Sequence, residues 1–292
     1  MRLAPLFHRR EGMWDLIIVT AQTQDLANAA CASLRTSSNH IRSAQLLAVA
    51  DPSTASPVGS GGSVLNAIVV AGEELSARGG HTTLSVEPLR SARVIVLQVA
   101  TTARGGSPHP CLPQALTAVP AVESATVLSG VSLTLRSASV LMADMPPGLV
   151  IASTDSIITL PAQPTSPLPL MGGAGTVVAL PLPLQHAVAH GVCVPGTSPT
   201  AKSTDLGSIL YRSTEDSLRA YAAPDGTVGV YTGLIYLAAT TATKLLELHV
   251  KPVRRAGSEP THTRPRKLEA HSSGCCSGLH ALADVGSFRS HS

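Results

Sequence analysis

The stretch Val58-Gly59-Ser60-Gly61-Gly62-Ser63-Val64-Leu65-Asn66-Ala67 is a glycine-rich turn that runs directly into an amphipathic helix. A short apolar run at 46–50 precedes it and predicts a buried strand. The helix is expected over residues 63–78, ending at the Gly79-Gly80 pair. Strand, loop and helix in this succession are the building unit of a parallel sheet with helices on its faces.

The same alternation continues on both sides of this unit. Strands are predicted at 16–20, 94–99, 149–152 and 176–180, a helix capped by Thr23 at 23–35, one or two strands at 227–237 after a Pro224-Asp225-Gly226 turn, and helices at 214–221 and 241–250. Residues 114–145 show no clean period. The pattern therefore predicts an α/β fold, a Rossmann-like, mostly parallel sheet with flanking helices.

Composition narrows the classes of function. The chain has 292 residues and a formal net charge of +3, too small to favour a nucleic-acid partner. No run of about 18 apolar residues occurs, so no membrane span is predicted. The five cysteines contain no C-x-x-C pair, which fits reduced thiols in a cytoplasmic protein.

The glycine-rich turn is a candidate anion site. Backbone N–H groups and the positive end of a helix dipole converge at such a junction and can hold a phosphate. The candidate phosphate- or nucleotide-binding residues are Gly59, Ser60, Gly61, Gly62, Ser63 and Asn66. The stretch is neither a dinucleotide fingerprint nor a Walker A loop, so a structural turn and helix cap stays the alternative.

Several segments, taken in order, resemble one family. They are Trp14–Thr20, the 46–52 strand and its glycine turn, Glu74–Arg78, Cys111-Leu112-Pro113, Ser153-Thr154-Asp155, His190-Gly191-Val192, Pro224-Asp225-Gly226 and Thr232-Gly233. Residues 14–252 resemble the amino-terminal domain of L-fucokinase, which is similar to GDP-fucose pyrophosphorylase. The resemblance implies a nucleotidyltransferase-type fold and Mg²⁺ as cofactor.

The resemblance also assigns candidate roles. Asp155 follows a buried strand and would hold Mg²⁺ against nucleotide phosphates, although an aspartate there also caps turns. A sugar would be bound by His190, Gly191, Thr232 and Gly233; a turn histidine and a strand bulge are the structural alternatives. In the loop that carries the family's basic residue, Arg104 is the only basic catalytic candidate, and the order of residues there is altered.

The implied function belongs to the L-fucose salvage pathway to GDP-fucose. The parent activities are ATP-dependent phosphorylation of L-fucose and guanylyl transfer to fucose 1-phosphate, with GTP or ATP as nucleotide partner. The GHMP kinase loop does not occur in this sequence, and the chain is expected to be truncated before that domain. We therefore expect binding with little turnover; the alternative is a catalytically silent regulatory or structural module. An NAD-type oxidoreductase is disfavoured because the third fingerprint glycine is missing. Residues 1–13 and 253–292 are expected to be disordered.

Overall fold

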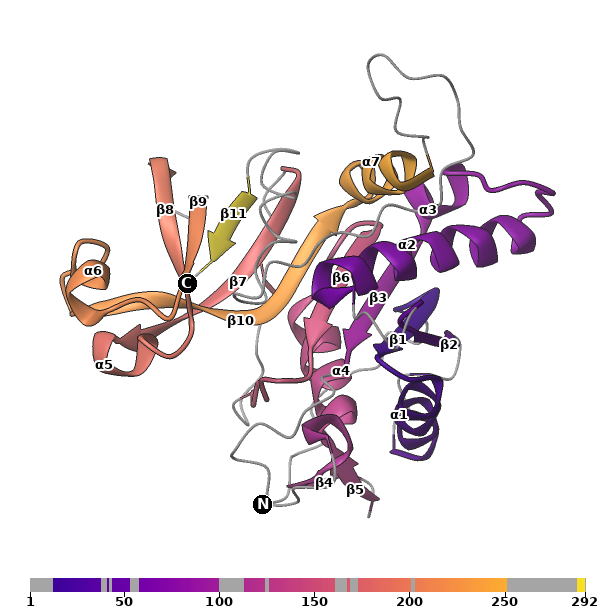
Figure 1. Ribbon diagram of the computed structural model, residues 1–292, viewed down its shortest axis with the longest axis horizontal. Coiled ribbons are helices and arrows are strands. Elements are labelled where there is room, and N and C mark those ends of the chain that lie inside the picture. The colour runs from indigo at the N-terminus through magenta and orange to yellow at the C-terminus, as the bar shows by residue number, and fades with distance from the viewer. Residues whose placement is uncertain are drawn as a thin grey trace.

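The computed structural model describes residues 13–37, 41, 44–52, 58–99, 113–123, 126–160, 167–168, 173–200, 203–250 and 288–291. The strands of its large sheet are β1 (Leu16–Ala21), β2 (Gln45–Ala50), β3 (Arg93–Gln98), β6 (Gly148–Ser153), β7 (Gly175–Pro183), β8 (Gly191–Thr200), β9 (Ser203–Tyr211), β10 (Thr227–Ala238) and β11 (Phe288–His291). They lie in the order β2-β1-β3-β6-β10-β7-β11-β9-β8 (Figure 1).

The first half of this sheet is parallel. β1 pairs in parallel with β2 and with β3, and β3 pairs in parallel with β6. All six residues of β1 are buried, as are the four central residues of β3. Continuous Val, Ile and Leu runs suit such strands because helices cover both faces of a parallel sheet. The predicted α/β fold with parallel core strands is confirmed.

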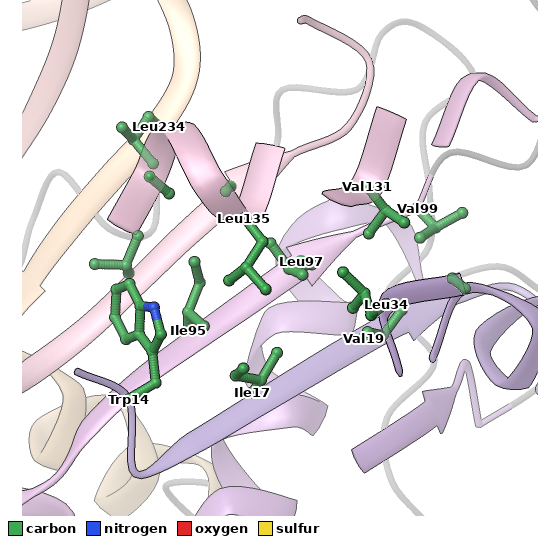
Figure 2. Packing of buried hydrophobic residues seen from close by; sticks show 14 of the residues in the cluster. Trp14, Ile17, Val19, Leu34, Ile95, Leu97, Val99, Val131, Leu135 and Leu234 are labelled. Atoms are coloured by element: carbon green, nitrogen blue, oxygen red, sulfur yellow. The ribbon is translucent and has the colours of Figure 1, made fainter. Parts of the chain in front are cut away.

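Helices cover the two faces of the parallel half. α1 (Gln24–Ser37) and α4 (Gly130–Leu141) lie on one face, and α2 (Gly59–Arg78), α3 (Glu87–Ser91) and α7 (Ala239–Val250) lie on the other (Figure 1). Figure 2 shows the core under α4, where Leu135 meets Ile95 and Leu97. Trp14 closes one end of this core, and its indole N–H donates to Ser139 Oγ at 2.9 Å.

The second half of the sheet is built around β10. This strand pairs antiparallel with β6, β7 and β8, so the sheet as a whole is mixed. Short helices α5 (Leu184–Ala187) and α6 (Glu215–Arg219) cover a small third core beneath its first residues, made by Ala187, Val192, Leu218, Val228 and Val230. β10 therefore joins this small core to the large one.

Strand β11 lies between β7 and β9. Its four residues belong to the segment 253–292 that the sequence led us to expect as disordered, so for these residues the expectation differs from the structure. Residues 251–287 lie outside the described part of the chain, and so do residues 1–12 of the expected disordered start.

Local hydrogen bonds fix one helix start and one turn that the sequence predicted. Leu26 N–H donates to Thr23 Oγ1 at 3.3 Å, which confirms the predicted cap of α1. In the Pro224-Asp225-Gly226 turn, both N–H and hydroxyl of Thr227 donate to Asp225 Oδ1, at 3.0 and 2.7 Å. These bonds lower the pKa of Asp225 because they stabilise its charged form.

Several elements differ from the sequence expectations, and strands β8 and β9 were not predicted at all. α2 begins at Gly59 rather than near residue 63, so the glycines form its first turn instead of a preceding loop. The aperiodic region contains a 3-10 turn at Gln114–Leu116, the hairpin of β4 (Ala118–Glu123) and β5 (Thr126–Ser129), and helix α4. None of the helices in the described residues has the length and apolarity needed to cross a membrane.

Candidate functional site

The carboxyl ends of the parallel strands meet at one edge of the sheet. Main-chain hydrogen bonds continue past the strands there: Asp51 N–H donates to Ala21 O at 2.9 Å, and Val99 N–H donates to Thr20 O at 2.8 Å. Ligands of open α/β sheets bind beyond this edge. The residues that the sequence singled out are therefore expected at this edge.

The start of α2 lies over the ends of β2 and β3. Ser63 Oγ donates to Asp51 Oδ1 in a short hydrogen bond, and Asn66 Nδ2 donates to Ala50 O at 3.3 Å. Gly59 and Ser60 are exposed, whereas Gly61 to Ser63 are half-buried. The Asp51 carboxylate therefore already faces the positive end of the α2 dipole, a stabilising arrangement.

Gln98 links the start of α2 to the end of β6. Its Nε2 donates to Ser60 O at 2.8 Å. Its main-chain carbonyl oxygen accepts hydrogen bonds from Thr154 N–H at 3.0 Å and from Thr154 Oγ1 at 2.9 Å. Sequence reasoning did not select Gln98 or Asp51. A usable signal existed, because each is the polar residue at or just after the end of an apolar strand.

Asp155 lies two residues beyond β6, at the carboxyl end of a central strand as expected. Its side chain is exposed, and its N–H donates to Ser153 Oγ at 3.2 Å. This hydrogen bond closes a local turn, and a turn is the structural role that the sequence left open for Asp155. Within the described ranges, no three His, Cys, Asp or Glu side chains come together as a metal site. One carboxylate fits Mg²⁺, because proteins often hold this ion through one or two carboxylates together with substrate phosphates.

The sheet is interrupted beside Asp155. On one edge of β10, Leu234 is opposite Ala152 of β6, and Val230 is opposite Val192 of β8. The other edge is paired with β7 up to Tyr231 and again from Ile235. β6 and β8 therefore follow one another along a single edge of β10, and the paired residues Val230 and Leu234 are four positions, about 13 Å of strand, apart.

Thr232 and Gly233 occupy this interruption. The pairing of β10 with β7 shifts register between Tyr231 and Ile235, and Gly233 has a φ of +86°. A side chain on Gly233 would put its Cβ 3.0 Å from Ser153 Cβ. Thr232 Oγ1 donates to Val178 O at 2.8 Å. The structure thus contains the bulge that was the alternative for this pair, and the bulge places β10 close to the Ser153–Asp155 turn.

His190 and Gly191 border the interruption from the side of β8. His190 is exposed, and its N–H donates to Ala187 O at 2.9 Å. Gly191 is opposite Tyr211 of β9, and a Cβ on Gly191 would lie 2.9 Å from the Tyr211 ring. The missing side chain at Gly191 therefore makes room for an aromatic ring, which is a structural reason for glycine at this position.

A small hollow opens beside the interruption. It is lined by residues of α4, β6 and β10 and of the segment after β6: Thr134, Ala138, Ala152, Ser153, Ile158, Thr232, Gly233 and Leu234. None of residues 59–66 lines it. The start of α2 lies instead on the far side of Gln98, so the two parts of the candidate site are neighbours along the edge and not one pocket.

Hydrogen bonds and close contacts connect the predicted phosphate-binding residues at the start of α2 to the predicted sugar-binding residue Gly233 on β10. The phosphate candidates contact Asp51 and Gln98, Gln98 contacts Thr154, and Ser153 contacts Gly233. Arg104, the catalytic candidate, lies outside the described residues. The roles of all these residues stay predictions.

The fold and this edge define an α/β protein whose candidate site spans the carboxyl ends of β2, β3 and β6. The family model described as the fucose pyrophosphorylase domain matches residues 89–275, and the chain belongs to that family. Membership gives it a nucleotide-sugar pyrophosphorylase-like role. The match begins after α2 and extends beyond residue 252, where the resemblance seen in the sequence ended.

Comparison with solved and curated proteins adds little more. The UTP-bound UGPase from Acinetobacter baumannii is similar over 96% of this chain and 86% of that chain, at 9% sequence identity and a TM-score of 0.33. A likeness at that level carries no argument about site residues. No curated protein matches the chain.

Proposed function

We propose that this chain binds a nucleoside triphosphate, GTP or ATP, together with L-fucose 1-phosphate or L-fucose, as a domain of the fucose salvage pathway to GDP-fucose. The start of α2 would receive the nucleotide, Asp155 would hold Mg²⁺ against its phosphates, and the interruption beside Thr232 and Gly233 would receive the sugar. The observation that carries this proposal is the line of contacts from Ser60 through Gln98 and Thr154, whose neighbour Ser153 meets Gly233.

The related reaction is guanylyl transfer. A phosphate oxygen of fucose 1-phosphate attacks the α-phosphorus of GTP, a new P–O bond forms, and pyrophosphate leaves. Negative charge develops on the transferring and leaving phosphates, and bound Mg²⁺ would stabilise it. The protein's part is to hold both phosphates in line at the carboxyl edge.

Lysine is absent from the first 201 residues of the sequence, which include β2, β3 and β6. Every lysine of the chain (Lys202, Lys244, Lys251, Lys267) follows residue 200. Loss of one well-placed charge-stabilising donor typically costs about 10²–10³ in rate. We therefore propose that the chain binds its ligands with little turnover, which also describes the alternative of a catalytically silent nucleotide-binding module in the same fold.

Calorimetric titration tests the proposal. GTP, ATP and fucose 1-phosphate are each titrated into the full chain with and without Mg²⁺. Asp155→Asn should weaken Mg²⁺-dependent nucleotide binding at least tenfold, because the change removes the charge and keeps the shape. Asp216→Asn is the matched control, since Asp216 is an exposed aspartate on α6, far along the chain from the edge.

Two results would contradict the proposal. If no nucleotide binds, the proposed nucleotide partner is wrong. If both variants bind with the same Mg²⁺ dependence as the parent chain, Asp155 is not a metal ligand. Production of GDP-fucose is measured in parallel. Rapid Mg²⁺-dependent turnover that Asp155→Ala abolishes would support the site and refute the proposed loss of catalysis.

A further inference from the structure

Strand β11 fills a slot between β7 and β9 (Figure 1). One edge of β7 is paired with β10, and one edge of β9 is paired with β8. β11 pairs in parallel with the other edge of β7, where Phe288 is opposite Gly175. It pairs antiparallel with the other edge of β9, where Arg289 is opposite Asp205. A four-residue segment therefore uses the main-chain groups of two strand edges at once, which is how strand addition holds a peptide.

The residues around the slot match the sequence of this segment. Position 175 is glycine, so β7 has no side chain opposite Phe288. Asp205 is half-buried and opposite Arg289, and opposite charges in such a pair favour strand pairing. Thr176 is also opposite Arg289, and its buried Oγ1 has no hydrogen-bond partner among the described residues. The slot therefore suits a short extended segment in which a basic residue follows a large apolar one.

The length of the connection does not fix which copy of the chain fills the slot. Residues 251–287 separate α7 from β11 along the sequence. A chain of that length spans up to about 120 Å, which is more than the width of about 50 Å expected for a folded domain of this size. The segment is therefore long enough to reach the slot of a neighbouring molecule, where it would make the same contacts.

We propose that the slot between β7 and β9 is a binding site for residues 288–291 of a second copy of this chain, and that reciprocal exchange of these segments forms a strand-swapped dimer. This proposal is independent of the proposed function. Exchange of an identical element is a low-cost route to a dimer because each slot keeps its contacts. A tether gives its own segment an effective concentration of about 1 mM, so the parent chain should be mostly monomeric at micromolar concentrations.

Two charge reversals make the exchange visible. Asp205→Arg puts two arginines opposite each other within one chain, and Arg289→Asp puts two aspartates opposite each other. In an equimolar mixture, each variant carries the segment whose charge the other variant's slot needs. If each restored pair is worth about fivefold, the mixed dimer gains about 25-fold, and its Kd falls from about 1 mM to about 40 μM.

Sedimentation velocity at about 100 μM, above this Kd, measures the dimer. Native mass spectrometry then shows whether it holds one copy of each variant. We expect a mixed dimer in the mixture and monomers for each variant alone. The matched control is the double variant Asp205→Arg/Arg289→Asp, which restores the opposite charges within one chain and should stay monomeric.

Two outcomes would overturn the proposal. One is a mixture that stays monomeric; the other is dimerisation of each variant alone to the same extent as the mixture, because that association would not need complementary charges. If a charge reversal prevents folding, Thr204→Cys in one chain and Ser290→Cys in another replace it, since these positions are opposite each other. Oxidation of the two together should give a disulfide-linked pair that neither forms alone, and its absence would equally reject the exchange.

Discussion

Replacing Gly233 by alanine should destabilise the protein through two separable effects. The first is backbone conformation: the φ of +86° disfavours any L side chain, at a cost of about 1–2 kcal/mol. The second is packing, because the new Cβ would lie 3.0 Å from Ser153 Cβ, closer than ordinary carbon contacts of about 3.5–4.0 Å. Relieving that contact by a small shift of the Ser153 turn costs about 1 kcal/mol.

Gly226→Ala separates the two effects. Gly226 has a similar φ of +79°, but a Cβ there would meet nothing within 4 Å. Gly226→Ala should therefore cost about 1–2 kcal/mol and Gly233→Ala about 2–3 kcal/mol. Urea unfolding followed by circular dichroism measures the difference. At a slope near 3 kcal/mol/M, the midpoint of Gly233→Ala should fall about 0.3 M further than that of Gly226→Ala.

A second comparison identifies Ser153 as the partner. Ser153→Gly removes the Cβ that the new alanine would approach, so the double variant should recover about 1 kcal/mol relative to the sum of the single changes. If Gly233→Ala is no more destabilising than Gly226→Ala, or if the double variant shows no coupling, the close approach of β10 to the Ser153 turn does not have the energetic importance argued here.

Three further predictions concern single contacts. Ser63→Ala should lower the free energy of unfolding by about 1 kcal/mol, measured in urea, because it removes the hydrogen bond to the half-exposed Asp51 carboxylate. Burial raises the pKa of the Cys193 thiol from 9.0 to about 12. The thiol loses its proton at lower pH in the unfolded state than in the folded state, so the free energy of unfolding should fall as pH rises from 9 to 12. Iodoacetamide at pH 8 should modify Cys193 only after denaturation. Ser139→Ala should cost about 1 kcal/mol and alter the fluorescence of Trp14, the only tryptophan, because its indole N–H loses its partner; an unchanged spectrum and melting temperature would contradict that hydrogen bond.

Strong local patterns were enough to predict the parallel half of the sheet. β1, β2, β3 and β6 are short continuous apolar runs, and each was expected within one or two residues of its observed bounds. Such runs are specific because a strand buried on both faces tolerates few polar residues. The placement of Asp155 followed from the same pattern, because the residue after a buried parallel strand must lie at the carboxyl edge.

Helix α4 could not be predicted in the same way. Its sequence is rich in serine and threonine, yet ten of its twelve residues are buried. The hydroxyls of Thr134 and Ser139 donate to the main-chain carbonyls four residues earlier, at 3.0 and 2.7 Å. Because their hydroxyl protons are bonded within the helix, these side chains can be buried as apolar ones are. Because buried serines and threonines stand among its buried apolar residues, the polarity of the sequence does not show which positions of α4 are buried.

The interruption in the sheet was equally hidden from sequence reasoning. It depends on β6 and β8 sharing one edge of β10, and those strands are separated by many residues along the chain. Gln98 escaped selection for a related reason. Its importance comes from contacts with Ser60 and Thr154, which belong to two other elements, and no local pattern records a contact between distant segments.

The central position of β10 has a consequence for the newly made chain. β10 is the partner of β6, yet 85 residues separate the end of β6 at Ser153 from the end of β10 at Ala238. At roughly 5–20 residues per second, the ribosome needs about 4 to 17 s to supply that length. During this interval the β10-facing edge of the apolar strand β6 has no partner for its main-chain hydrogen bonds. Unpaired strand edges of this kind favour aggregation or the binding of chaperones to the nascent chain.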